Sequence, residues 1–126
     1  MADEKKVIAY FEDDRGKTMI AEDTLSEKFP ECNLIFDKGV GNASESVDRV
    51  IKSANGIEKI ALVCTDGHLL NCKGWEILTV LREKGYRGPA VYTGFSILPE
   101  EFKGLYQIII GDELLSSELR KLELNL

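Results

Sequence analysis

Acidic residues stand directly after two strand-like runs of this 126-residue chain. Residues 12–14 (Glu-Asp-Asp) follow the apolar run 7–11, and Asp66 closely follows the largely apolar run 59–64. If the two runs are neighbouring strands of one sheet, their acidic ends converge. Carboxylates that lie within a few ångströms repel one another, and either proton uptake or a hard divalent cation such as Mg2+ relieves the repulsion. The alternative is that these acids are solvated turn residues.

The elements that must position these acids show two alternating periodicities. Short, continuously apolar runs predict strands, and apolar residues at helical spacing predict helices. Strands are expected at 7–11, 33–36, 59–64, 89–93 and 106–110, and helices at 17–29, 44–54, 74–84 and 112–122. Strands that alternate with helices form a parallel sheet with right-handed crossovers. The prediction is a single α/β domain over residues 1–126, with a flavodoxin-like, doubly wound, five-stranded parallel sheet of strand order 2-1-3-4-5 and helices on both faces.

Particular side chains are expected to fix how the helices sit on this sheet. In the first helix, Ile20, Leu25 and Phe29 are expected to form the apolar stripe that packs inward. Ser44 is expected to cap the second helix, and Trp75 is expected to pack in the third. These assignments decide which residues face the sheet and which face solvent.

Composition and charge narrow the function classes. The formal net charge is −6, which does not favour binding to nucleic-acid phosphates or to an anionic membrane. No apolar run approaches the ~20 residues needed to span a bilayer, and residues 1–6 lack the apolar segment of a signal peptide. Three cysteines without an export signal indicate reduced thiols and a cytoplasmic protein. We expect no nucleic-acid partner and no membrane partner.

The acidic runs and the residues around them resemble the receiver domains of two-component response regulators, the chemotaxis-type domains of phosphorelay signal transduction. The resemblance extends from Val7 to about Leu122. The run 11–14 is similar to the hydrophobic-acid-acid signature that follows the first strand in this family. Gly74 lies eight residues after Asp66, which is the spacing between the family's phosphoacceptor and its glycine.

The chemistry that the resemblance implies centres on Asp66, which would be the phosphoacceptor. Its carboxylate would be the nucleophile that takes a phosphoryl group from a sensor histidine kinase or a phosphotransfer protein. Mg2+ would be bound by Glu12, Asp13 and Asp66 and by the backbone carbonyl of His68, with Glu12 helping through water. The implied protein is a stand-alone phosphoprotein rather than an enzyme, and a downstream protein would recognise its phosphorylated surface.

The resemblance also assigns roles at the ends of the fourth and fifth strands. Thr93 and Gly94 match the family's pair of a hydroxyl residue and a small residue. Thr93 would donate a hydrogen bond to the phosphoryl group, and Gly94 would leave room for that group. Tyr106 would be the aromatic switch residue, whose ring moves inward when Thr93 shifts. The alternative for Tyr106 is a tyrosine that packs at a strand start.

Two departures from the family pattern leave alternatives open. The family carries a lysine at the end of the fifth strand, where this chain has Ile109 or Ile110, and Leu70 replaces the proline that is common four residues after the acceptor. Arg15 is the nearby cation that the sequence offers instead. Slow phosphorylation with unusual reliance on Mg2+ is therefore expected. One alternative is a phosphorylation-independent pseudo-receiver, an interaction module. A small metal-dependent phosphohydrolase is disfavoured, because no second substrate-binding segment is evident.

Other motifs in the sequence give weaker indications of function. Cys64, His68 and Cys72 are spaced by four, which suggests zinc, but Cys64 is expected in the core and no fourth ligand is evident. Buried or loop cysteines are the favoured interpretation. Residues 39–42 (Gly-Val-Gly-Asn) resemble part of a phosphate-binding loop, but no lysine-serine pair follows. His68 could tune phosphate loss at the pocket mouth, or it could be a plain surface histidine.

Overall fold

A parallel sheet forms the centre of the molecule. The computed structural model describes residues 5–93, 107–108 and 126. The strands are β1 (Val7–Phe11), β2 (Asn33–Asp37), β3 (Ile60–Asp66), β4 (Ala90–Thr93) and β5 (Gln107–Ile108). Their order in the sheet is β2-β1-β3-β4-β5, and every neighbouring pair is parallel. The predicted fold class and strand order are confirmed. Because β1 and β3 are neighbours, the sequence segments that follow them lie at the same edge of the sheet.

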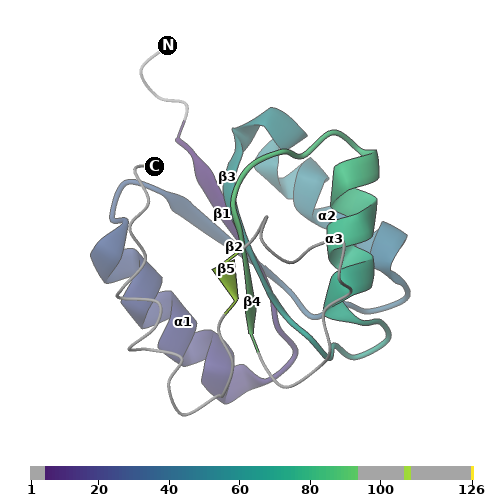
Figure 1. Cartoon of the computed structure of the whole chain (residues 1–126). Coiled ribbons are helices and arrows are strands. Elements are labelled where there is room, and N and C mark those ends of the chain that lie inside the picture. Colours follow the sequence, from purple (N-terminus) through teal and green to yellow (C-terminus); the bar gives the residue numbers. More distant parts are fainter. Residues whose placement is uncertain (1–4, 94–106, 109–125) are drawn as a thin grey trace.

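Helices cover both faces of this sheet (Figure 1). The described helices are α1 (Arg15–Lys28), α2 (Ala43–Ala54), the short 3-10 helix η1 (Ile57–Lys59) and α3 (Gly74–Glu83). In Figure 1, α1 lies on one side of the strands, and α2 and α3 lie on the other. The helix expected at 112–122 and most of the strand expected at 106–110 fall outside the described residues. Across the described ranges, no helix has the length and apolar character that a membrane span requires.

Alternating strand residues supply two hydrophobic cores, one on each face. All five residues of β1 are buried, which explains why its sequence is continuously apolar. Phe11 packs with residues of α2 and α3, including Val47 and Ile77. Tyr10 packs on the opposite face, with Leu25 of α1 and Cys64 of β3. The sheet is therefore held from both sides.

The packing stripe expected on α1 is wrong at one position. Ile20 is 45% exposed, and the buried residues of the helix are Ala21, Thr24 and Leu25. Ile20 and Leu25 are five residues apart, which places them about 140° apart around a helix. Ile20 and Leu25 therefore cannot lie on the same narrow stripe of the helix. The stripe that contains Leu25 faces the sheet.

The expected cap of α2 is also wrong. The helix begins at Ala43, and its N-cap is Asn42, whose side-chain oxygen accepts a hydrogen bond from the amide of Glu45 at 2.9 Å. Ser44 is the second residue of the helix, because the helix begins before the first of its large apolar residues. In α3, Trp75 lies at the surface, 36% exposed, while Ile77 supplies the buried contact.

Candidate functional site

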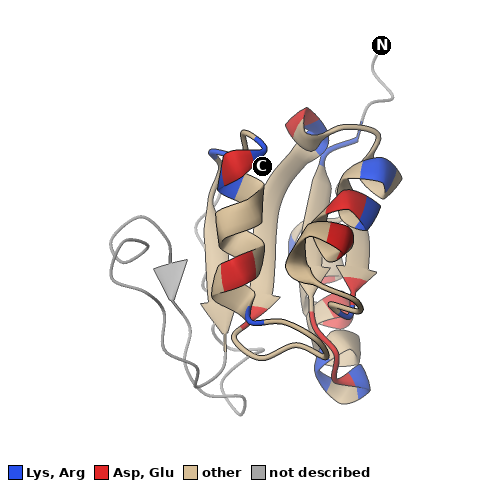
Figure 2. Ribbon diagram, turned by 90° about the vertical axis from the view of Figure 1, so that its right-hand side faces the viewer, with Lys and Arg blue, Asp and Glu red and all other residues tan. Residues whose placement is uncertain are grey.

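Three carboxylates meet where β1 and β3 end side by side. Glu12 and Asp13 follow β1, and Asp66 is the last residue of β3. One ligand oxygen from each lies within 4.8 Å of the other two. Glu12 and Asp66 are buried, and Asp13 is half-buried. Figure 2 shows acidic residues gathered at these strand ends and in the segment that leads into α1. The structure thus brings together the three side chains that the sequence nominated as metal ligands.

Glu12 is the most enclosed of the three. Its side chain is 1% exposed, and Oε2 accepts hydrogen bonds from the backbone amides of Asp13 (3.1 Å) and Asp14 (3.2 Å). Oε1 is buried and finds no hydrogen-bond partner within the described part of the chain. Burial, together with the charge of Asp66, raises the pKa of Glu12 to about 8. Without a cation, Glu12 therefore keeps its proton to a higher pH than an exposed glutamate does.

A lysine of α1 lies against the cluster. Nζ of Lys17 is 3.8 Å from Oδ2 of Asp66, and the two side chains are 23% and 10% exposed. The charge of Lys17 also acts to lower the pKa of Glu12. Sequence reasoning missed this residue, because it took Lys17 as the start of the helix and looked to Arg15 for a cation. Arg15 is exposed at the start of α1.

Asp14 does not join the carboxylate cluster to which its neighbours Glu12 and Asp13 belong. It is the N-cap of α1, and its Oδ1 accepts hydrogen bonds from the amides of Gly16 (2.8 Å) and Lys17 (3.3 Å). The Asp14 side chain is exposed and caps the helix. It is not part of the cluster, which contains Glu12, Asp13 and Asp66. The expectation that a fourth carboxylate shares the pocket is wrong. Its actual contribution is to fix the first turn of the helix that carries Lys17.

Thr93 sits beside the cluster on the next strand. It is the last residue of β4, is 3% exposed, and is the register partner of Asp66. The Thr93 carbonyl accepts a hydrogen bond from the amide of Gly67 at 2.8 Å. Two other nominated residues, Gly94 and Tyr106, lie outside the described residues. The roles assigned to these three stay predictions.

The loop after Asp66 returns tightly to the sheet at Gly74. The amide of Gly74 donates to the carbonyl of Gly67 at 2.9 Å. A Cβ added at Gly74 would lie 2.2 Å from the backbone oxygen of Asp66 and 2.9 Å from Cε1 of Tyr92. No side chain fits there, so the glycine at residue 74 has a steric cause. Leu69, in the same loop, is buried at 7% exposure.

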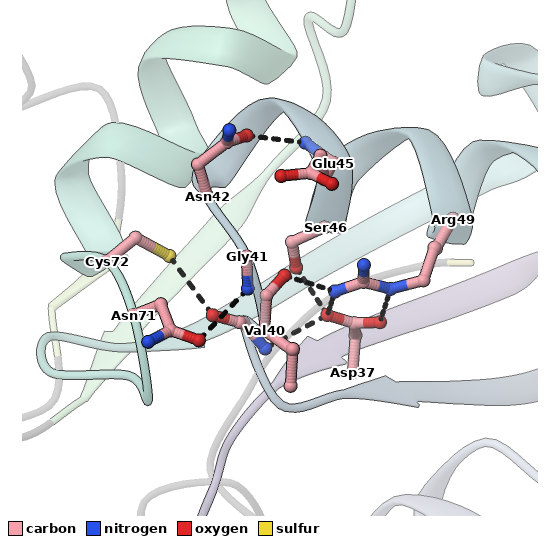
Figure 3. A network of polar contacts seen from close by, with 10 residues as sticks. Asp37, Val40, Gly41, Asn42, Glu45, Ser46, Arg49, Asn71 and Cys72 are labelled. Atoms are coloured by element: carbon pink, nitrogen blue, oxygen red, sulfur yellow. Dashed lines mark hydrogen bonds and ion pairs between the residues drawn. The ribbon is translucent and has the colours of Figure 1, made fainter.

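A polar network holds the turn between β2 and α2 (Figure 3). Arg49 of α2 donates from Nε to Oδ1 of Asp37 (2.9 Å), and from Nη2 to Oδ2 of Asp37 (3.1 Å) and to the Val40 carbonyl (2.8 Å). Ser46 and the Gly39 amide also donate to Asp37. Burial alone would raise the pKa of Asp37, but these hydrogen bonds hold it below its ordinary value.

The same turn is bonded to the loop that follows Asp66. The Gly41 amide donates to Oδ1 of Asn71 (2.9 Å), as Figure 3 shows. The Asn71 amide donates to the Gly39 carbonyl (3.1 Å), and the Leu70 amide donates to the Lys38 carbonyl (3.3 Å). Leu70 stands where the receiver family has proline. The Leu70 amide, a group that proline lacks, donates the hydrogen bond that ties this position to the neighbouring turn.

The zinc interpretation of the cysteines is wrong. Cys64 is buried in the core on the α1 face, and Cys72 packs against the core on the opposite face. Among the described residues, the side chains close enough to share a cation are those of Glu12, Asp13 and Asp66, and neither cysteine is among them. His68 is exposed, and both its ring nitrogens are 3.2 Å from Nζ of Lys73. The side chain of His68 thus lies at the surface, and its backbone carbonyl stays a predicted metal ligand.

The donor set suits a hard divalent cation. Every ligand atom that Glu12, Asp13 and Asp66 offer is a carboxylate oxygen, the type that Mg2+ and Mn2+ bind. The buried, unpartnered Oε1 of Glu12 is an oxygen that such a cation would satisfy. Mutual repulsion among the three carboxylates gives a further reason for a cation to bind. The residues present therefore fit Mg2+.

Comparison with known proteins identifies the fold. No protein-family model matches the sequence, and no curated protein sequence does. Solved structures do match. The phosphorylated cyanobacterial phytochrome response regulator RcpA is 15% identical, with a TM-score of 0.67 over 92% of this chain and 89% of that one. The Mn2+-bound form of the response regulator Rcp1 is 17% identical, with a TM-score of 0.66 over 94% of this chain and 91% of that one.

A third match widens this comparison. A response regulator receiver domain from Rhodospirillum rubrum is 19% identical, with a TM-score of 0.63 over 91% of this chain and 89% of that one. At these identities the likeness is one of fold. The chain has the fold of response-regulator receiver domains, as its sequence motifs predict.

Proposed function

We propose that this protein is a response-regulator receiver that accepts a phosphoryl group on Asp66 with the help of Mg2+. The observation that carries the proposal is the meeting of Asp66 with Glu12 and Asp13 within 4.8 Å at the edge of a receiver fold. RcpA, with this fold, is described as phosphorylated, and Rcp1 as Mn2+-bound. Both descriptions support the same chemistry here.

The chemical step moves a phosphoryl group to an oxygen of Asp66 from a nitrogen or an oxygen of the donor. An Asp66 carboxylate oxygen forms a bond to phosphorus, and the bond from phosphorus to the donor atom breaks. The donor atom is a histidine ring nitrogen of a kinase or phosphotransfer protein, or an oxygen of a small acyl phosphate. The leaving group keeps the electron pair of the broken bond. Asp66 thereby becomes an acyl phosphate.

Other residues prepare Asp66 for this step. Glu12, Asp13, Asp66 and the carbonyl of His68 would hold Mg2+, which when bound supplies positive charge to the phosphoryl oxygens. Thr93 is buried beside Asp66 in the register of β3 and β4. In the proposal, its hydroxyl donates a hydrogen bond to the phosphoryl group. In the proposal, Gly94 leaves space there.

The proposed output is a change in a surface that another protein recognises. Tyr106 is the proposed switch residue that follows the position of Thr93. The partners are a sensor histidine kinase or phosphotransfer protein upstream and a signalling protein downstream. A cytoplasmic location is part of the proposal, and the three free thiols fit a reducing compartment.

A direct test uses a small acyl phosphate donor with Mg2+ and intact-mass measurement. Wild-type protein should gain the mass of one phosphoryl group, and Asp66→Asn should gain none, because the amide is not nucleophilic. Asp23→Asn, which alters an exposed aspartate of α1, should behave like wild type. An adduct that persists in Asp66→Asn would assign the acceptor to another residue.

Mg2+ alone should raise the melting temperature of the protein. A ligand that binds only the folded state stabilises it by about 2.7 kcal/mol at a hundred times its Kd, which is roughly 10 °C for a domain of this size. The rise should saturate and exceed that from NaCl at equal ionic strength. Asp13→Ala should lose most of the rise, whereas Asp48→Ala, at an exposed position of α2, should keep it. A melting curve that ignores Mg2+ contradicts the metal site.

A second candidate function is a phosphorylation-independent interaction module. The feature that favours it is the absence of lysine at residues 104–120, which include the predicted fifth strand. The mass experiment separates the two candidates. If wild-type protein gains no phosphoryl group from any donor in Mg2+, the interaction module replaces the receiver proposal.

A further inference from the structure

The acceptor site is rich in negative charge, and the sequence has no lysine where the resemblance to receiver domains leads us to expect one. Glu12, Asp13 and Asp66 place up to three negative charges together. An arriving phosphoryl group adds more negative charge next to them. In the sequence, Ile109 and Ile110 occupy the place where the resemblance to receiver domains leads us to expect a lysine. A positive charge must therefore come from another element, or transfer to Asp66 must proceed without it.

Lys17 is placed to supply that charge. It is the third residue of α1, and the Asp14 cap fixes its backbone through a hydrogen bond to its amide (3.3 Å). Asp14 also accepts, through its backbone carbonyl, from the amide (3.0 Å) and hydroxyl (2.9 Å) of Thr18. Side chains at this helix position point back toward the cap. That direction takes Nζ of Lys17 to 3.8 Å from Oδ2 of Asp66.

The burial of Lys17 and Asp66 makes their ion pair stronger than one between two exposed side chains. Its side chain is 23% exposed, so it is largely enclosed yet can still reach a group that enters from solvent. Asp66 is 10% exposed. Attraction between charges is stronger in such a half-buried setting than between fully solvated groups. Lys17 therefore lies beside one oxygen of Asp66 and remains partly open to solvent.

We propose that Lys17 is a catalytic residue of phosphoryl transfer, the cation that pairs with Asp66 before the reaction and with a phosphoryl oxygen after it. The inference rests on the proposed function. As the bond from Asp66 to phosphorus forms and the bond to the donor breaks, the ammonium keeps all its protons. It shifts from the acceptor oxygen to the charge that collects on the transferred group.

If Lys17 has this role, its removal should change Mg2+ affinity and phosphorylation rate in a way that a lysine that only stabilises the fold would not. In the resting protein, Lys17 and Mg2+ compete for the negative charge of Asp66. Removing the ammonium should therefore tighten Mg2+ binding. The same change should slow phosphoryl transfer, because a charge-assisted hydrogen bond to the transferred group is lost. The two effects run in opposite directions.

The test compares Lys17→Met, which keeps the length of the stem, with Lys17→Arg and a control. The control is Lys28→Met, which removes a lysine at the far end of the same helix. Phosphorylation rate is followed by intact mass with a small acyl phosphate, and the Mg2+ Kd is measured by calorimetric titration. Lys17→Met should phosphorylate about ten- to hundredfold more slowly and bind Mg2+ several-fold more tightly. Lys17→Arg should recover most of the rate, and Lys28→Met should match wild type.

Each other outcome overturns the inference. If Lys17→Met phosphorylates as fast as Lys28→Met, the receiver proposal stands and the role of Lys17 is refuted. If Lys17→Met loses Mg2+ affinity together with rate, Lys17 supports the fold of the site and does not act in transfer. If wild-type protein gains no phosphoryl group, the proposed function fails and the role of Lys17 fails with it.

Discussion

Gly74→Ala should destabilise the protein by about 3 kcal/mol or more, at the upper end of the cost of overpacking. The added Cβ would lie 2.2 Å from the backbone oxygen of Asp66. That oxygen belongs to the last residue of a central strand, so it cannot move aside as the end of a flexible side chain can. Either α3 shifts away from the sheet or the end of β3 is distorted. In a thermal melt, we expect a loss of roughly 10 °C.

The matched control is Gly16→Ala. Gly16 lies in the first turn of α1, and a Cβ there would meet the tip of the exposed Asp14 side chain at 3.3 Å. Alanine also favours the helix, so the net change should stay within about 1 kcal/mol. Equal melting temperatures for Gly74→Ala and Gly16→Ala would mean that the loop after Asp66 relaxes freely. The site would then be less rigidly built than the hydrogen bond from Gly74 to Gly67 indicates.

Glu12→Gln should change how stability depends on pH in the absence of Mg2+. In the folded protein the pKa of Glu12 is raised from 4.5 to about 8. Between these values the folded state holds a proton that the unfolded chain has released. The free energy of unfolding of wild type therefore falls as pH rises through this window, by a few kcal/mol in total. Glutamine does not titrate, so Glu12→Gln should lack this fall and be the more stable protein at pH 8.

Chemical denaturation in EDTA at pH 5 and pH 8 measures this difference. Glu22→Gln, at an exposed position of α1, should keep the slope of wild type. With saturating Mg2+ the fall should shrink, because the cation favours the ionised form of Glu12. If wild type and Glu12→Gln show the same slope in EDTA, the burial of Glu12 next to Asp66 is not what controls its protonation.

The architecture could be predicted because local and global signals agree along the chain. Continuous apolar runs such as residues 7–11 are what a strand buried on both faces requires, and the intervening helices have stripes that match. Finer assignments failed where one local signal was used alone. Ile20 is as apolar as Leu25, but the direction of α1 relative to the sheet decides which of them is covered. Asn42 and Ser44 are both good N-cap residues, and the point at which the chain enters the helix decides that Asn42 is the cap.

The cluster of acids was accessible to sequence reasoning because strand order alone brings Asp66 next to Glu12 and Asp13. Lys17 was not found, because a side chain's direction depends on where its helix begins. With Asp14 as the N-cap, Lys17 is the third helical residue, and a side chain at that position points back toward the cap. The half-buried pair of Asp37 and Arg49 had no recognisable spacing, since one partner ends a strand and the other lies on a helix, and their meeting depends on the fold.

The bonds between the two loops have a consequence for local unfolding. Asn71 and Leu70, in the loop after Asp66, are tied to residues 38–41, which Arg49 and Asp37 hold in turn. Neither loop can open without breaking hydrogen bonds to the other. The two loops thus form one cooperative unit, whose opening free energy includes the bidentate pair at Asp37. The backbone beyond the acceptor is therefore anchored from the face opposite Lys17, and thermal opening on that face is rare compared with motion of a free surface loop.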